Sequence, residues 1–168
     1  MRFVAALIVV LLAGCGYHSP GSSDAWVGGD ARILYIQLFE NRTTEPYVDN
    51  YMTDALVAEL SRSRLVALTE DQALADVQLV GEVKDFVSSA LAYGTTDQIT
   101  EYRATMNVSV RLLRKGTNEV LWQQHLQRSE DYLATVNKSR ELEGQSLAAQ
   151  QVSKRLAEDI YSSLLNNF

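Results

Sequence analysis

Apolar and polar positions follow several distinct patterns along this chain, and each pattern predicts a different kind of element. Residues 33–39 (ILYIQLF) are nearly all apolar and include β-branched side chains, which predicts a buried strand. Apolar residues then recur at every fourth position, the spacing of one face of a helix. They are Val48, Met52, Leu56 and Leu60. The folded part is therefore expected to begin with a strand and an amphipathic helix.

Thr43 or Thr44 is placed to cap this helix, with Glu45 and Pro46 in its first turn. The helix is expected to continue to about residue 62. Residues 65–68 then predict a short second strand. Because a strand, helix and strand in sequence form a right-handed crossover, the two strands are expected to be parallel.

Beyond residue 76 the period of the pattern changes to two, which is typical of strands with one buried face. On the first such strand the predicted core residues are Val77, Leu79, Val83, Val87 and Leu91. On the second they are Tyr102, Ala104, Met106, Val108, Val110 and Leu112. Turns near 94–98 and 115–118 separate these strands from a third, on which Val120, Trp122 and Leu126 share a face. Short turns of this kind predict an antiparallel meander.

The last pattern is again helical and covers residues 139 to about 166. Its apolar stripe consists of Leu147, Ala149, Val152, Leu156, Ile160 and Leu164. The fold class predicted from all these patterns is α+β, with two helices packed on one face of a mixed sheet. The sheet has five strands if residues 65–69 pair with it, and four otherwise. Its other face is expected to be wet, with Thr105, Asn107, Ser109, Gln123 and Gln127 exposed.

The first 14 residues have the order of a bacterial lipoprotein signal peptide. Arg2 precedes an uncharged apolar run over 3–13, which is too short to span a membrane as a helix. Small residues then lead to Cys15, and this ending resembles the lipobox. The resemblance implies that residues 1–14 are removed and that Cys15 carries a diacylglycerol and a palmitate. The alternative is an ordinary secretory signal followed by an unrelated cysteine.

Residues 15–30 contain several Gly and Ser and predict a flexible membrane tether, which leaves 31–168 as a single domain. Two or three acyl chains anchor a protein stably, whereas one alone binds only marginally. Under the sorting rule for such lipoproteins, Gly16 indicates the outer membrane, with the domain facing the periplasm. Tyr17 and Trp26 either rest at the membrane interface, or are solvated or packed on the domain.

Composition narrows the chemistry further. The net charge of −6 is a poor match for nucleic acid, which attracts clustered cations. One cysteine excludes an intramolecular disulfide, and two histidines with one cysteine do not predict a metal site. No phosphate-binding glycine loop or nucleophile elbow is present. We therefore expect no enzymatic activity and no cofactor besides the lipid on Cys15. A lipid-anchored hydrolase would instead pair His125 with a serine or aspartate.

The order of several short motifs resembles the LptE family of lipopolysaccharide-assembly lipoproteins. The two longest are residues 12–18 (LAGCGYH) and 39–46 (FENRTTEP). The others are 53–56 (TDAL), 99–103 (ITEYR), 120–122 (VLW) and 156–160 (LAEDI). The resemblance spans the chain and implies the same fold of two helices on a mixed sheet.

The resemblance also implies a function and partners. Such lipoproteins plug the LptD β-barrel of the outer membrane, help it assemble and help deliver lipopolysaccharide to the outer leaflet. The family's basic residues suggest Arg103, Lys138 and Arg140 as contacts for lipid A, meeting at one end of the domain. The hairpin tip at 94–98 departs from the family because it has no cation. The alternative function is a periplasm-facing scaffold of another envelope complex, such as a secretion or cell-wall-binding assembly.

Overall fold

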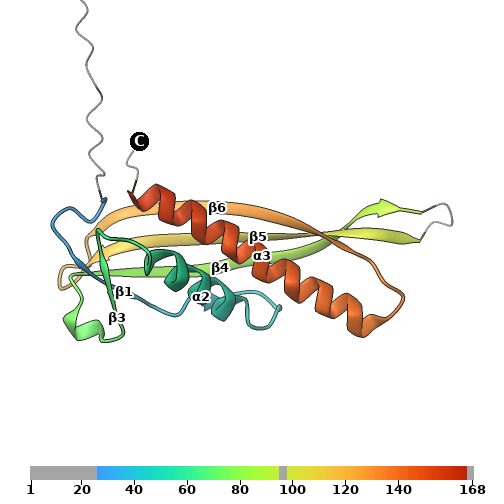
Figure 1. The fold of residues 1–168 in the computed structure, drawn as a ribbon, viewed down its shortest axis with the longest axis horizontal. Coiled ribbons are helices and arrows are strands. Elements are labelled where there is room, and N and C mark those ends of the chain that lie inside the picture. The colour runs from blue at the N-terminus through green and yellow to red at the C-terminus, as the bar shows by residue number, and fades with distance from the viewer. Residues whose placement is uncertain (1–25, 95–97, 166–168) are drawn as a thin grey trace, which may run out of the picture.

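The computed structural model describes residues 26–94 and 98–165, which form a sheet with two helices on one face (Figure 1). The predicted α+β class is therefore confirmed. The strands are β1 (Ile33–Ile36), β2 (Glu40–Asn41), β3 (Ala67–Thr69), β4 (Val77–Tyr93), β5 (Ile99–Arg114) and β6 (Val120–Leu133). The helices are α2 (Val48–Leu60) and α3 (Lys138–Leu165), with a 3₁₀ turn at Gln72–Leu74.

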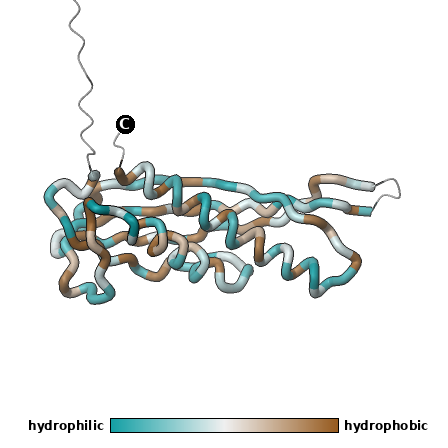
Figure 2. The backbone as a smooth tube through the Cα atoms, in the orientation of Figure 1, coloured by the Kyte–Doolittle hydropathy of each residue, from teal (hydrophilic) through white to brown (hydrophobic). Residues whose placement is uncertain are grey.

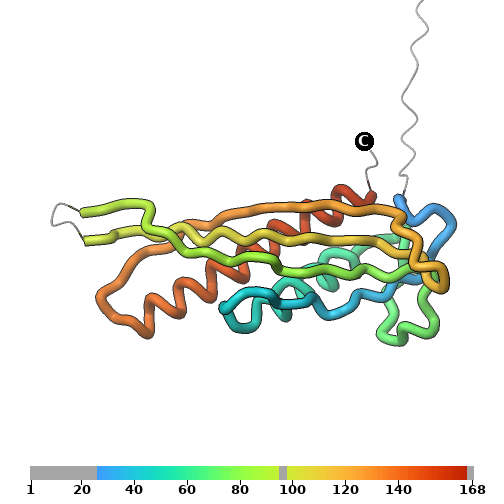
Figure 3. Tube along the Cα trace, turned by 180° about the vertical axis from the view of Figure 1, so that it is seen from behind, coloured from blue at the N-terminus to red at the C-terminus, as the bar shows by residue number. Residues whose placement is uncertain are grey.

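The sheet is mixed, with strand order β3-β1-β4-β5-β6 and β2 beside β4. β1 pairs in parallel with both β3 and β4, whereas β4, β5 and β6 form an antiparallel meander. Leu34 on β1 lies opposite Leu68 on β3, so residues 67–69 do join the sheet. The two-residue strand β2 was not predicted from the sequence. Seen from behind, the strands lie in front of both helices, and this face of the sheet is uncovered (Figure 3).

The core lies between the sheet and the two helices. The predicted stripe of α3 is fully buried from Ala149 to Leu164, except that Leu147 is 55% exposed and does not belong to it. Along α3 the colour alternates between hydrophobic and hydrophilic, as expected for a helix with one buried face (Figure 2). The predicted core positions of β5 from Ala104 to Leu112 are also buried.

The start of α2 differs from the prediction because a side chain organises a turn before it. Asn41 Oδ1 accepts hydrogen bonds from the backbone N–H and the hydroxyl of Thr43, both at 2.8 Å. Asn41 Nδ2 donates to the carbonyl oxygen of Glu45, also at 2.8 Å. Thr43 therefore serves the turn and not the helix, which begins only at Val48. Its N-cap residue, Tyr47, has a positive φ of 65° and makes no side-chain cap.

An irregularity in the pairing of β4 with β5 changes which side chains of β4 point to the core beyond Val83. The register of β4 against β5 shifts between Val83 and Asp85, so that Phe86 lies opposite Met106. Phe86 then packs against the core, whereas Val87 is 48% exposed. The expectation that Val87 and Leu91 share the core face with Val83 is wrong. The bulge after Val83 adds one residue and moves the side chains of residues 85–90 to the other face, and Leu91 lies at a second irregularity, between Ala90 and Ala92.

The folded part of the chain begins earlier than residue 31. Trp26 is 6% exposed and its indole Nε1–H donates to the carbonyl oxygen of Ala31 at 3.0 Å. The backbone N–H of Val27 donates to the carbonyl oxygen of Leu164 at 3.1 Å, near the end of α3. Within the stretch predicted as a tether, residues 26–28 therefore pack on the domain, whereas Gly29 and Asp30 are exposed. Cys15 and the rest of the predicted tether and signal lie outside the described residues.

Candidate functional site

The uncovered side of the sheet, called the open face below, is polar over its central strands. Its charged groups are linked, since Glu82 lies 2.9 Å from Arg42 and 3.4 Å from Lys84. Two amides on the same face, Gln37 and Gln78, belong to a separate hydrogen-bonded chain, in which Gln72 donates to Gln78 at 3.0 Å and Gln78 donates to Gln37 at 2.6 Å. Strand alternation produces this face, because the apolar side chains of the same strands point to the helices.

A shallow hollow of about 630 Å³ lies on the open face. Its polar lining includes Gln37, Gln78, Glu82, Arg111, Gln123 and His125. The expected wet face is present, with Gln123 and Gln127 exposed. Ser109 was expected to be exposed as well but is only 9% exposed. Thr105 is half-buried, and its hydroxyl lies 2.9 Å from that of Ser129.

His125 lines this hollow and is exposed. Within residues 26–94 and 98–165 it makes no hydrogen bond or ion pair with a serine or aspartate, which is the pairing that a hydrolase would need. The same residues contain no group of three or more His, Cys, Asp or Glu side chains able to hold a metal ion.

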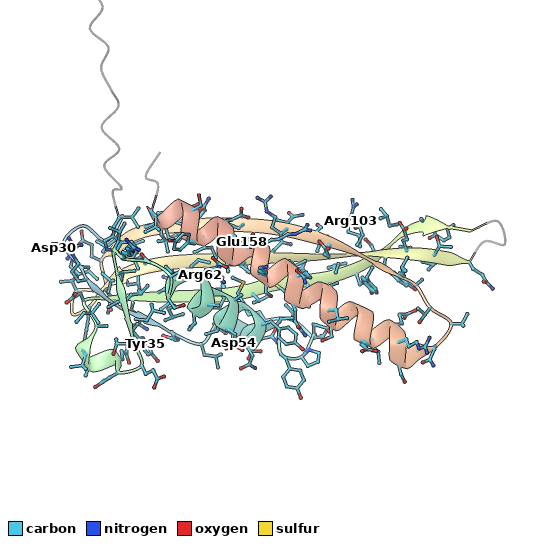
Figure 4. All side chains as sticks on the ribbon, viewed as in Figure 1. Asp30, Tyr35, Asp54, Arg62, Arg103 and Glu158 are labelled. Atoms are coloured by element: carbon cyan, nitrogen blue, oxygen red, sulfur yellow. The ribbon has the colours of Figure 1, made fainter. Side chains whose placement is uncertain are left out.

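Arg103 lies on β5 toward the hairpin end of the molecule, far from Asp30 at the other end (Figure 4). Its guanidinium donates to both carboxylate oxygens of Asp131 on β6, at 2.7 and 2.9 Å. This hydrogen-bonded pair lowers the pKa of Asp131 and raises that of Arg103. Arg103 is therefore already compensated in charge, although both side chains remain half-exposed.

Lys138 is the first residue of α3, and its ammonium lies 2.6 Å from the carboxylate of Glu141. Tyr102 and Tyr132 lie near Lys138. These two rings stack with their centroids 5.4 Å apart. The hydroxyl of Tyr132 lies 2.5 Å from that of Ser88, and burial raises its pKa. Side chains from β4, β5, β6 and the start of α3 thus cluster at the base of the hairpin that β4 and β5 form.

The three predicted lipid A contacts do not share one surface. Tyr102 and Arg103 are successive residues of a strand, so their side chains point to opposite faces. Lys138 lies on the side of Tyr102, and Arg103 lies on the open face. Arg140 is exposed, and its side chain makes no ion pair within the described part of the chain. The structure therefore leaves Arg140 as the least compensated of the three cations.

Two ion pairs between β6 and α3 were missed from the sequence. Arg128 donates to both carboxylate oxygens of Asp159, at 2.6 and 2.9 Å. Glu130, two residues along the strand, lies 2.8 Å from Arg155, one helical turn earlier. The sequence does contain a signal for these pairs, because opposite charges stand two residues apart on the strand and four residues apart on the helix. That signal could be used only with the knowledge that α3 runs beside β6.

These features define an α+β domain with helices on one face and a polar open face on the other, the architecture of several bacterial lipoproteins of known structure. The chain belongs to the LptE family, described as lipopolysaccharide-assembly, whose family model matches residues 31–166. None of the curated proteins matches the chain. No helix in the described part combines the length and apolarity needed to cross a membrane.

Solved structures show the same fold at low sequence identity. Rare lipoprotein B from Shewanella oneidensis is 20% identical, with a TM-score of 0.50 over 75% of this chain and 92% of that one. The minor lipoprotein from Acinetobacter baumannii is 18% identical, with a TM-score of 0.52 over 81% and 94%. PelC from Paraburkholderia phytofirmans, described as a dodecamer, is 14% identical, with a TM-score of 0.55 over 80% and 87%.

Proposed function

We propose that this chain is an outer-membrane lipoprotein that plugs and helps assemble an LptD-type β-barrel and assists lipopolysaccharide transport to the outer leaflet. A lipid on Cys15 anchors it, the domain faces the periplasm, and its role is non-catalytic. The observation that carries this proposal is membership of the lipopolysaccharide-assembly family across residues 31–166. The lipoprotein descriptions of the neighbours from Shewanella and Acinetobacter support the same class.

The open face supports the plug role on physical grounds. The interior of a transmembrane barrel is polar, so a plug must present polar groups around a rigid core. In this chain, linked charges and an amide chain occupy the open face, while the apolar side of the sheet is covered by α2 and α3. The hollow of about 630 Å³ leaves room on this face for water or for polar groups of the barrel wall.

Contact with lipid A requires cations, because its phosphates form their strongest hydrogen bonds with arginine and lysine. We assign the first contact to Arg140, with a second contribution from Lys138, two residues earlier at the start of α3. Arg103 has a smaller part, since Asp131 already holds its guanidinium. A site made of a few local cations fits a chain whose net charge is −6.

Affinity purification of the tagged full-length lipoprotein from detergent-solubilised outer membrane tests this proposal. A large β-barrel recovered in equal amount with the wild-type protein is the expected result. A Cys15→Ser variant is the matched control, because it lacks the thiol that carries the lipid and is expected to be lost from the membrane fraction. Recovery of a soluble or ring-forming partner instead would contradict the plug role and favour the alternative role as an envelope scaffold. The PelC neighbour, which shares the fold, is described as a dodecamer.

A further inference from the structure

β6 forms one margin of the sheet and pairs only with β5 in the described part of the chain. From Trp122 to Leu133 its register against β5 has no break. The outer edge therefore presents a long and regular row of backbone groups with no strand beside them.

The register shows which backbone groups point outward. Ala134 N–H donates to the carbonyl oxygen of Thr100, so these two residues form a hydrogen-bonded pair. Hydrogen-bonded and non-hydrogen-bonded pairs alternate in an antiparallel ladder. The residues of β6 whose N–H and C=O point away from β5 are therefore the odd-numbered ones, namely Gln123, His125, Gln127, Ser129, Asp131 and Leu133.

Natural proteins protect such edges with short strands, bulges, prolines or lysines. The opposite margin follows this rule, because β3 has only three residues. The outer part of β4 follows it too, with irregularities after Val83 and after Ala90. Residues 120–133 contain neither proline nor lysine. Their charged side chains form ion pairs with α3 or β5 and do not shield the outer edge. None of the four protective features named above is therefore present along this edge.

A hollow of about 250 Å³ lies along the same edge, between β6 and the end of α3. Its lining includes Gln124, Leu126, Arg128, Asp159 and Ser163. The side-chain Oε1 of Gln124 is buried and has no hydrogen-bond partner among the described residues. A buried acceptor of this kind is costly when unpaired, and a donor side chain entering from the edge would supply its partner.

The position of this edge indicates a membrane-embedded partner. Val27 N–H donates to the carbonyl oxygen of Leu164, so the described chain starts beside the end of α3, the helix end that also lines the hollow. Eleven peptide steps separate Trp26 from Cys15 and span at most ~40 Å. If Cys15 is lipidated, this margin of the sheet stays within reach of the bilayer.

We propose that an extended segment of the partner β-barrel pairs with the outer edge of β6 between Gln123 and Asp131 and adds a strand to the sheet. This inference rests on the proposed function. The recognition is by main-chain hydrogen bonds, with one side chain of the segment entering the hollow beside Gln124. The open-face side chains of the same residues lie next to this interface, so the edge and the open face form one continuous contact surface.

The test replaces Gln127 in the full-length lipoprotein and measures the barrel recovered by affinity purification. Gln127→Pro removes an N–H that points away from β5 and so leaves the β5 ladder intact. Gln127→Ala removes the same side chain but keeps that N–H. We expect Ala to recover the barrel as the wild type does, and Pro to recover it about fivefold less. Thermal unfolding of both variants checks that each is folded.

A photo-crosslinking amino acid at position 127 provides a second measurement that does not need the proline variant to fold. The control position is Asp54 on α2, the helix that lies well away from β6 in Figures 1 and 3. A crosslink to the barrel from 127 and none from 54 is expected. Normal barrel recovery by folded Gln127→Pro, or a crosslink from 127 to a second copy of this chain, overturns the inference. If the wild type recovers no barrel at all, the proposed function fails, and this inference fails with it.

Discussion

The guanidinium of Arg103 on β5 donates to both carboxylate oxygens of Asp131, its direct neighbour on β6. This pairing turns a residue that the family resemblance suggests for lipid A into one whose charge is compensated. The two residues also occupy the open face, whereas Lys138 lies on the opposite side near Tyr102. Cations that suggest one site in the sequence are thus divided between two surfaces.

The first prediction concerns lipid A binding by the purified full-length lipoprotein. The combined variant Lys138→Gln and Arg140→Gln is expected to lower the affinity for lipid A about tenfold. It removes Arg140, which makes no ion pair in the described part of the chain, together with Lys138, whose side chain is 74% exposed although it pairs with Glu141. Arg103→Gln is the matched control and is expected to change the affinity less than about twofold. Titration of fluorescent lipid A measures both. An equal loss in the two variants would show that Arg103 is a principal contact after all.

The second prediction concerns the close contact between Phe39 and Gly81. A Cβ atom at position 81 would lie 2.2 Å from the ring of Phe39, which is only 2% exposed. Gly81→Ala is therefore expected to lower the free energy of unfolding by about 2 kcal/mol, as overpacking of a core does. Phe39→Leu removes the ring, so the same alanine should cost clearly less in that background. Urea unfolding of the two single variants and the double variant measures this coupling, and strict additivity would disprove it.

Long periodic patterns predicted the main elements of the fold because burial dictates them locally. The stripe of α3 and the alternation of β5 are confirmed nearly residue by residue, because the burial of each position follows from the apolar face of its own element. Val87 and Leu91 were assigned to the wrong face because the bulge after Val83 and the second irregularity, at Leu91, depend on pairing with β5. The pattern of a single strand does not contain its register against a neighbour.

Contacts between distant residues were the part that sequence patterns did not contain. Arg103 and Asp131 are far apart in the chain, and a slip of one residue between β5 and β6 would separate them. The turn at Asn41 was missed for a related reason. Thr43 is as good an acceptor for a helix N-cap as for a turn, and only the geometry of Asn41 decides between the two.

The third prediction is a pH dependence caused by Asp76. Its carboxylate accepts hydrogen bonds from the backbone N–H groups of Arg32 and Ile33, both at 2.9 Å, and these bonds lower the pKa of Asp76 below its ordinary value. A lowered pKa in the folded state means that the stabilisation is complete above about pH 4 and is lost as the pH falls through the folded value.

Asp76→Asn is therefore expected to lower the free energy of unfolding by about 1 kcal/mol at pH 7, a figure reduced because the side chain is exposed. The difference from the wild type should shrink as the pH is lowered from 5 to 3. Exposed Asp54, whose carboxylate makes no hydrogen bond or ion pair with the described residues, is the control, and Asp54→Asn should show no such trend. A constant difference for Asp76→Asn across this range would refute the assignment.

The fourth prediction concerns the ion pair that joins α3 to β6. Arg128→Glu places a carboxylate opposite Asp159 and beside Glu130, so we expect it to lower the free energy of unfolding by about 1 kcal/mol in low salt. Exchanging the partners, with Arg128→Asp and Asp159→Arg together, should restore much of that loss. Lys154→Glu reverses a charge on the same helix at a position with no ion pair in the described part of the chain, and should change the free energy of unfolding little.

Added salt should narrow the difference in unfolding free energy between Arg128→Glu and the wild type, because screening weakens repulsion between exposed charges. A loss of packing would not respond to salt. Urea unfolding at two ionic strengths separates these causes, and a gap that does not change with salt would mean that Arg128 acts through its aliphatic stem and not through its charge.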